Sequence, residues 1–276
     1  MFAKIKHVAL YTENHEMTAQ FYKTIFGMKQ ITSGMPDETG KSNPKRGFLG
    51  DGVIELALLR RDPGDRTGLD HFGFEVEDSG AAVERLRENF PDVMIRDSLA
   101  IVPFAEKRAH DPLGVSFDIS QKGVIKPNAK KYTPDHKDEG WDQPRHFNHI
   151  AIRVCRPDRS AKLFKKVFEL DEVPNNGEEG ICLTDGHSFL VIRQCDTTSY
   201  NTMKNGLDHV GFKVEDLEAV KAELDDIAKT LPMAAGPKID LAHRSFGKIT
   251  RGIVEACKLG EHATCDPTGV LIDLSV

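Results

Sequence analysis

An internal duplication constrains the fold of this chain more than any other feature. The eleven residues from Gly68 to Asp78 match those from Gly206 to Asp216 at 9 of 11 positions. Two further segments, 111–120 and 266–275, follow in the same order and share the pattern Asp-Pro-x-Gly-Val-x-x-Asp. Repeats of this kind indicate duplicated folding units. The sequence therefore predicts two related halves.

The predicted halves span residues 1–120 and 146–276, with residues 121–145 between them. This intervening stretch is rich in Lys, Asp, Pro and Gly and has little apolar periodicity, which is typical of a surface linker. Each half divides again, because it contains two similar strand-like segments with one histidine each. These histidines are His7 and His71 in the first half, and His149 and His209 in the second. We therefore expect four modules, each beginning with a histidine-bearing strand.

Helical and then strand patterns follow each of these segments. Apolar residues recur with helical spacing over 17–26, 81–90, 159–168 and 217–228, and Gly27 and Pro91 are suited to end the first two helices. Short β-branched or aromatic runs predict strands over 53–59, 101–104, 189–192 and 270–274. The predicted fold class is α+β, with modules of one strand, one helix and about three strands. Paired modules of this kind would form cupped sheets whose inner face carries the functional residues.

Composition narrows the function to a soluble enzyme or a binder of small molecules. Of the 276 residues, 39% are hydrophobic, which is enough for an ordinary core. No apolar run approaches the roughly 20 residues that span a bilayer, so we expect no membrane partner. The formal net charge of -6 disfavours nucleic acid, because phosphate binding needs a basic face. The first residues lack an export signal, so we expect a cytoplasmic protein and leave a homo-oligomer open.

Two acidic residues, Asp118 and Asp273, stand inside otherwise apolar terminal strands. Burying a carboxylate without a partner is costly, and a divalent metal ion would supply that partner. Two histidines and one carboxylate that converge from strands form the facial arrangement that leaves metal positions open for substrate and dioxygen. Alternatively, the carboxylates receive backbone N–H groups or a lysine, and each histidine is an ordinary core or surface residue.

These features resemble the vicinal oxygen chelate superfamily, which includes glyoxalase I, methylmalonyl-CoA epimerase, bleomycin-resistance proteins and the type I extradiol ring-cleavage dioxygenases. The resemblance covers both halves. It is carried by the four histidine-bearing strands and by two Asp-Pro-x-Gly-x-x-x-Asp segments, which are similar to the family's Asp-Pro-x-Gly-x-x-x-Glu. It implies four βαβββ modules paired into two glyoxalase/dioxygenase-like domains with cupped mixed sheets.

The resemblance also implies two sets of metal ligands. In the family, the first-strand histidine of each module in a pair and the acid of the last strand hold the metal. The corresponding residues are His7, His71 and Asp118 in the first half, and His149, His209 and Asp273 in the second. Glu55 falls where glyoxalase-like members carry a fourth ligand, whereas the second half has Phe189 there. The first half is thus similar to glyoxalase I or the epimerase, and the second half is similar to a dioxygenase.

His187 resembles the catalytic acid–base histidine of the extradiol enzymes, because a Ser and an apolar residue follow it as in their His-Ser/Thr-aliphatic segment. An imidazole that titrates near neutral pH suits the removal of a phenolic proton; the alternative is that His187 only occupies a turn. His243 is similar to an outer histidine of the same enzymes. Two departures are that the extradiol tyrosine before Asp-Pro-x-Gly is Ala263 here and Arg108 in the first half, and that both acids are Asp instead of Glu.

Three functions remain open at this point. The first is an extradiol-like dioxygenase with one non-haem Fe(II) in the second half, which binds a small-molecule substrate through two vicinal oxygens. The second is a glyoxalase- or epimerase-like lyase or isomerase with a metal such as Mn, Zn or Ni and with Glu55 as ligand or base. The third is a metal-free binding protein of the bleomycin-resistance type.

Overall fold

The computed structural model describes residues 3–32, 41, 47–61, 64, 66–98, 105–124, 143–174, 180–195, 205–236 and 260–276. In the first half they form two modules. The elements of the first module are β1 (Ala3–Thr12), α1 (His15–Phe26), β2 (Lys29–Gln30), β3 (Leu49–Gly50) and β4 (Glu55–Arg60). Those of the second are β5 (Gly68–Val76), α2 (Ser79–Asn89), β6 (Arg96–Asp97), β7 (Lys107–His110) and β8 (Ser116–Gln121).

The second half repeats this order of elements. The third module consists of β9 (His146–Val154), α3 (Pro157–Phe168), β10 (Asp171–Val173), β11 (Ile181–Thr184) and β12 (Phe189–Gln194). The fourth consists of β13 (Gly206–Lys213), α4 (Leu217–Thr230), a short 3-10 helix (Pro232–Ala234), β14 (His262–Cys265) and β15 (Leu271–Ser275). Three strands follow the helix in each of the first three modules, and two follow it in the described part of the fourth.

Local signals explain where the helices begin and end. The side chains of Asn14, Asp78 and Asp216 each accept a hydrogen bond from a backbone N–H in the first turn of α1, α2 and α4, where those donors have no helical partner. α3 begins instead with Pro157, whose fixed φ suits a first helical position. Gly27 ends α1 in the left-handed conformation, with φ of 65°. All four predicted helices are confirmed, with bounds that differ by at most two residues.

Three of the four strands predicted beyond the helices are also confirmed, as β4, β12 and β15. The fourth, 101–104, lies outside the described residues, as do 125–142 of the predicted linker. The bounds of the two domains and the linker therefore stay a prediction. None of the helices that the structure describes is both long and apolar enough to span a bilayer.

Each half forms one open mixed sheet. The strand order is β2-β3-β4-β1-β5-β8-β7-β6 in the first half and β10-β11-β12-β9-β13-β15-β14 in the second. In both, the first strands of the two modules lie side by side and antiparallel, as β1 with β5 and β9 with β13. The last strand of the half runs parallel to the second of these, as β8 along β5 and β15 along β13. Three neighbouring strands near the centre of each sheet therefore carry the pattern that the two halves share, and the predicted fold class is confirmed.

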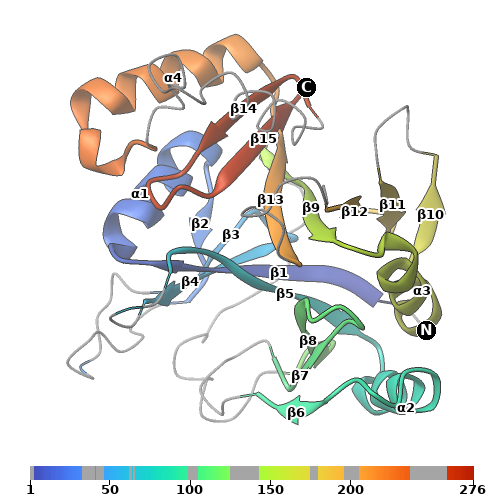
Figure 1. The fold of residues 1–276 in the computed structure, drawn as a ribbon. Coiled ribbons are helices and arrows are strands. Elements are labelled where there is room, and N and C mark those ends of the chain that lie inside the picture. Colours follow the sequence, from blue (N-terminus) through green and yellow to red (C-terminus); the bar gives the residue numbers. More distant parts are fainter. Residues whose placement is uncertain are drawn as a thin grey trace.

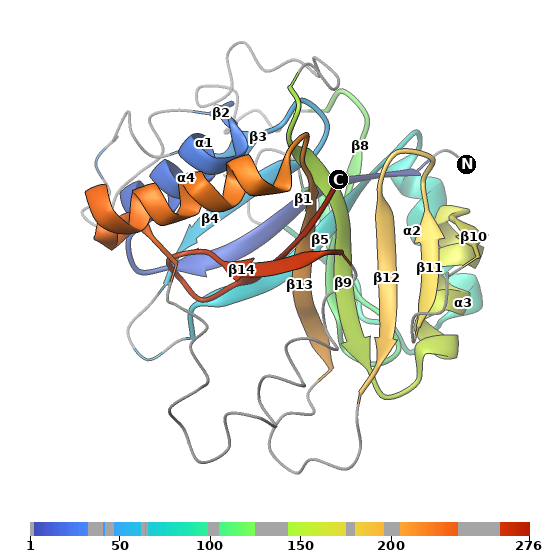
Figure 2. The same ribbon diagram turned by 90° about the horizontal axis from the view of Figure 1, so that it is seen from above.

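The helices cover one face of each sheet. Some of their side chains also pack against the sheet of the other half. Phe74 on β5 stacks on Phe168 of α3, with ring centroids 4.1 Å apart. In the matching contact, Phe26 of α1 stacks on Phe212 of β13 at 3.9 Å. Figures 1 and 2 show α1 beside α4 on one side of the molecule and α2 beside α3 on the other. Because side chains alternate along a strand, the residues next to Phe74 on β5 and next to Phe212 on β13 point to the opposite face of the sheet.

Aspartates link the two halves in symmetric pairs. The Asp51 carboxylate accepts a hydrogen bond from the backbone N–H of Phe147 at 2.7 Å, and Asp185 accepts one from Ile5 at 2.6 Å. The Asp that opens each Asp-Pro-x-Gly turn accepts backbone N–H groups of its own turn. The second carboxylate oxygen of this Asp accepts a hydrogen bond from a hydroxyl group on a helix of the other half. These pairs are Asp111 with Ser160, and Asp266 with Tyr22. The motif aspartates are therefore structural residues that hold the halves together.

Candidate metal centres

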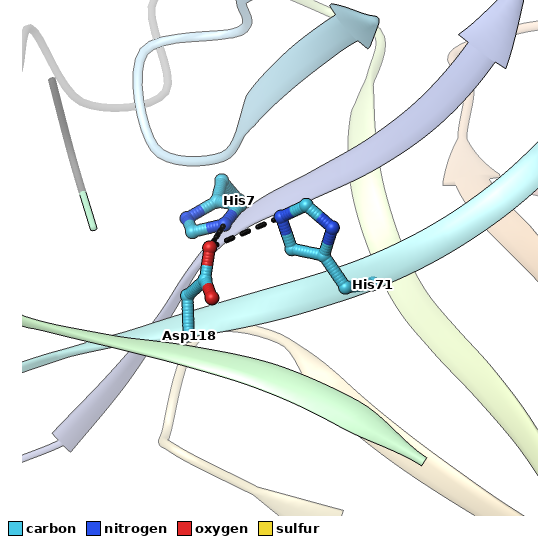
Figure 3. A group of neighbouring side chains, drawn as sticks. All are labelled: His7, His71 and Asp118. Carbon is cyan, nitrogen blue, oxygen red and sulfur yellow. Dashed lines mark ion pairs between the residues drawn. The ribbon is translucent and has the colours of Figure 1, made fainter. Parts of the chain in front are cut away.

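The first-half triad predicted from the sequence comes together on three neighbouring strands. His7 lies on β1, His71 on β5 and Asp118 on β8, and Figure 3 shows the three side chains pointing toward one another. Nε2 of His7 and of His71 lie 3.6 and 3.1 Å from Oδ2 of Asp118. One candidate ligand atom from each residue lies within 4.8 Å of the others, and all three side chains are buried.

The second-half triad has the same construction. His149 of β9, His209 of β13 and Asp273 of β15 are buried, and their candidate ligand atoms also lie within 4.8 Å of one another. The Nε2 atoms of the two histidines face each other at 3.1 Å, and Nε2 of His149 lies 3.8 Å from Oδ2 of Asp273. Two nitrogens bound at about 2.1 Å to one ion and about a right angle apart would be separated by about 3.0 Å. The spacing of this pair fits a shared metal ion.

A glycine makes room for each first-strand histidine. His7 must reach across β5 to approach Asp118 on β8, and the residue that it crosses is Gly73. A Cβ at Gly73 would lie 2.1 Å from Cε1 of the His7 ring. A Cβ at Gly211, the matching residue of β13, would lie 2.0 Å from Cε1 of His149. The repeated Asp-His-x-Gly sequence thus supplies both a ligand and the space for the ligand of the neighbouring strand.

A β-bulge changes the direction of the side chain that precedes each of the four histidines. The ladder between β1 and β5 shifts register at Lys6 and again at Asp70, and the ladder between β9 and β13 shifts at Asn148 and Asp208. An extra residue in one strand turns its side chain relative to the regular alternation. As a result, the residue just before each of the four histidines is available to contact the same site.

The two bulge aspartates hold the second-module histidines in place. Nδ1 of His71 lies 2.6 Å from Oδ2 of Asp70, and Nδ1 of His209 lies 2.9 Å from Oδ2 of Asp208. A carboxylate on Nδ1 fixes the ring and leaves Nε2 for the centre of the triad, as in many metal sites. Sequence reasoning missed this role, although the Asp-His pair occurs in both copies of the repeat.

Electrostatics favour neutral His149 in the second half. Burial, assisted by the nearby His209 and Arg193, lowers the pKa of His149 well below its usual value, so its ring does not hold a second proton that a metal would have to displace. Asp208 stays charged, because its hydrogen bond with His209 and the charges of His209, Arg153 and Arg193 outweigh burial and lower its pKa. Nη2 of Arg153 lies 2.7 Å from the second oxygen of Asp208.

In the first half, Arg108 on β7 points into the triad. Its Nε and Nη2 donate to the two carboxylate oxygens of Asp118 at 2.7 and 2.9 Å, and Nη2 also lies 2.8 Å from Nε2 of His71. Burial alone would raise the pKa of Asp118, but the hydrogen bonds from Arg108, His7 and His71 hold it well below its usual value. The second half has Ala263 at this place, since Arg108 pairs with Asp118 as Ala263 pairs with Asp273.

Glu55, the predicted fourth ligand, lies on β4 directly beside His7 but is not among the residues of the first cluster. Its Oε1 atom lies 3.3 Å from Nζ of Lys6, and both side chains are only 3% exposed. The second half has Phe189 beside His149 and Asn148 in place of Lys6. The extra acid of the first half therefore has a lysine for a neighbour, and its ligand role stays a prediction.

Neither of the two histidines predicted to take part in catalysis is among the residues of the described metal clusters. His187 lies in the exposed turn between β11 and β12, where its backbone N–H donates to Asp185 at 2.8 Å. The structure does not bring its side chain into the described cluster of the second half. His243 lies outside the described residues. Their catalytic roles stay predictions.

Comparisons with known proteins agree with this architecture. Residues 4–112 match the family model of the Glyoxalase/Bleomycin resistance protein/Dioxygenase superfamily. A lactoylglutathione lyase of Arabidopsis thaliana is 25% identical over 174 residues, which are 59% of this chain and 53% of the relative. The chain thus spans about half the length of that curated relative.

Solved structures show the same fold at low sequence identity. The Mn(II)-bound glyoxalase from Novosphingobium aromaticivorans superimposes with a TM-score of 0.61 and 13% identity, covering 98% of this chain and 81% of that one. An extradiol ring-cleaving dioxygenase from B. fuscum has a TM-score of 0.59 and 11% identity, covering 99% and 71%. The superfamily consists mostly of metal-dependent enzymes. The matched segment, the duplicated halves and the two His/His/Asp triads are consistent with the vicinal oxygen chelate superfamily.

Proposed function

We propose that this chain is a metal-dependent enzyme whose active centre is the second-half triad of His149, His209 and Asp273. Its substrate is a small molecule that presents two vicinal oxygens, and its reaction is an extradiol-like cleavage that uses dioxygen and Fe(II). The cytoplasmic location and a homo-oligomer stay expectations from the sequence alone.

One observation carries the choice of this half. The facing Nε2 atoms of His149 and His209 lie 3.1 Å apart, and the residue across from Asp273 is an alanine. At the same place in the first half, the Arg108 guanidinium contacts the carboxylate and a histidine. A three-residue set with Phe189 beside it would leave coordination positions open for substrate and dioxygen.

The residues of the chain prepare this site for a metal ion. Asp208 orients His209 through Nδ1 and is itself paired with Arg153. His149 is neutral because burial lowers its pKa, and Gly211 gives its ring the space to face His209. When bound, the ion would supply the Lewis-acid chemistry that orients two substrate oxygens. We assign the transfer of the substrate proton to His187, whose exposed turn precedes β12.

A second candidate is a lyase or isomerase, favoured by the sequence match to a lactoylglutathione lyase. For this reaction a bound ion such as Mn, Zn or Ni would supply the Lewis-acid polarisation of a carbonyl, a neighbouring carbon would lose a proton, and no oxygen would be consumed. Glu55 was the residue expected to act as ligand or base. Its neighbour Lys6, at 3.3 Å, makes the first half the weaker place for this chemistry.

The two candidates separate in one pair of assays. Protein reconstituted with Fe(II) in the absence of oxygen is mixed aerobically with catechol and 4-substituted catechols, and oxygen uptake and the coloured ring-cleavage product are measured. We expect both signals in the wild type and neither in His149→Ala. Lactoylglutathione formation by the Mn, Zn or Ni form, without oxygen uptake on any diol, would instead establish the lyase. Protein that retains no metal would leave only a binding function.

A further inference from the structure

Arg108 contacts the same carboxylate oxygens and histidine nitrogen of the first triad that a metal ion would bind. It donates to both carboxylate oxygens of Asp118 and lies 2.8 Å from Nε2 of His71. Nε2 of His71 thus faces both the Arg108 guanidinium and Oδ2 of Asp118, which lies 3.1 Å away, while Nδ1 lies beside Asp70. Arg108 therefore occupies the space beside both carboxylate oxygens of Asp118 and Nε2 of His71.

The second acid near this triad also has a cation of its own half. Glu55 pairs with His7 in the register of β1 and β4, and its carboxylate lies 3.3 Å from Nζ of Lys6. Lys6 reaches this position because it is the bulged residue before His7. Both partners are buried, at 3% exposure each, and buried charges are rarely found without an opposite charge.

We propose that the first triad binds no metal ion, and that Arg108 and Lys6 provide there the two positive charges that a divalent cation would provide. Each of the two cations lies against one of the two acids that glyoxalase-like coordination would use. A metal ion could enter only by driving a guanidinium out of its contacts and then remaining close to two like charges. The inference rests on the proposed function only in expecting a metal in the second half.

The equivalent positions of the second half differ together. Ala263 stands for Arg108, Asn148 for Lys6 and Phe189 for Glu55, as the matching strand registers show. At these three positions, uncharged residues replace two cations and one acid beside an otherwise identical His/His/Asp set. A single random difference would not produce this concerted pattern, whereas the exchange of one divalent ion for two side-chain cations would.

If the first triad binds no metal ion, the first half supports the structure of the second-half site. It contributes α1, whose Phe26 stacks on Phe212 of the strand that carries His209. It also contributes Asp51, which binds the backbone of Phe147 two residues before His149. The ion pairs of Arg108 and Lys6 would keep the centre of the first-half sheet ordered without a metal ion.

The test isolates the first triad in the double variant His149→Ala/His209→Ala. Co(II) is titrated into the full-length protein, visible absorption bands report its coordination, and elemental analysis after dialysis gives the metal content. We expect no Co(II) in this background. Adding Arg108→Ala and Lys6→Asn, which copy the second half, is expected to create a site that binds one Co(II) per chain. Binding of Co(II) by the double variant alone would overturn the inference.

A second variant keeps the inference testable if the quadruple variant does not fold. His7→Ala alone breaks the first triad and leaves the second intact, so the metal content of the wild type and of His7→Ala should be equal. A lower content in His7→Ala would overturn the inference. Failure of the proposed function is distinct, because it would appear as a second half that takes up no metal in His7→Ala.

Discussion

The two triads of this chain have the same ligands, the same strands and different neighbours. In both, histidines from two antiparallel strands meet an aspartate from a third strand, over a glycine that leaves room for a ring. In the first, Arg108 contacts the aspartate and a histidine; in the second, Ala263 stands at that place. The comparison teaches that a retained ligand set does not by itself identify a metal site. The charge of the next residue outward decides whether a cation is still needed.

Transferring the arginine should produce the largest effect. In Ala263→Arg, a guanidinium directed at Asp273 would compete with the metal, and like charges about 4 Å apart cost about 4 kcal/mol at a surface-like dielectric. We expect at least about a 1,000-fold loss of metal affinity in the second half, measured by competition with a chromophoric chelator. Ala263→Met adds length without charge and should lose less than about tenfold. Equal losses in the two variants would assign the effect to bulk and not to charge.

Filling the two glycine spaces compares the halves directly. Gly211→Ala would place a Cβ 2.0 Å from the His149 ring, and Gly73→Ala would place one 2.1 Å from the His7 ring. Both should lower the free energy of unfolding by about 1–3 kcal/mol, the usual cost of overpacking. Metal affinity should fall only in Gly211→Ala, by at least about 100-fold. A matching loss of metal in Gly73→Ala would mean that the first triad also holds an ion.

Removing the carboxylate behind a histidine should have a moderate effect. Asp208→Asn keeps the shape of the side chain but loses the charge that orients Nδ1 of His209 and pairs with Arg153. Such outer partners contribute about 10- to 100-fold to metal affinity, and we expect a loss near the lower end. The matched variant Asp70→Asn should leave affinity and metal content unchanged. Isothermal titration with Mn(II) measures both, and a loss in Asp70→Asn would contradict the distinction between the halves.

The link between the halves should depend on pH. Burial outweighs the hydrogen bonds from Phe147, Val53 and Ile54 and raises the pKa of Asp51 from 3.8 to about 6. Because the folded state holds this proton more tightly than the unfolded state, protonation of Asp51 stabilises the fold fully below about pH 4. That contribution, roughly 3 kcal/mol, is lost as the pH rises through 6.

Urea unfolding of the wild type and of Asp51→Asn between pH 4 and 8 measures this contribution. The stability of the wild type relative to the variant should fall by roughly 2.5 kcal/mol between pH 4 and 7, since only the wild type titrates at this position. A constant difference over that range would show that Asp51 keeps an ordinary pKa in the fold.

Much of the architecture could be predicted because the repeat is direct. Identity between 68–78 and 206–216, together with the similar segments around His7 and His149, predicted four equivalent strands. The face on which the histidines lie stayed open, and the two ligand sets were implied by the family resemblance. The bulges at Lys6 and Asp70 could not be predicted, because a register shift depends on the partner strand and leaves no periodic signal. Without the bulges, neither the Lys6 contact with Glu55 nor the support of His71 by Asp70 follows from the sequence.

The role of Arg108 was only half visible in the sequence. Its position three residues before Asp-Pro-x-Gly marked it as a departure from the extradiol pattern, but the cross-strand pair with Asp118 depends on the turn between β7 and β8. The contacts of Phe26 and Phe168 with the other half were not predicted either, since their apolar spacing is the same whichever sheet they contact. The tertiary partner decides such contacts, and the helix sequence alone does not name it.

The metal content of the purified chain tests the central claim most directly. Wild type, His7→Ala and His149→Ala are purified without chelator, loaded with one divalent metal, dialysed and analysed for metal per chain. The account predicts one ion in the wild type and in His7→Ala, and none in His149→Ala. Two ions in the wild type, or loss of the ion in His7→Ala with retention in His149→Ala, would contradict it.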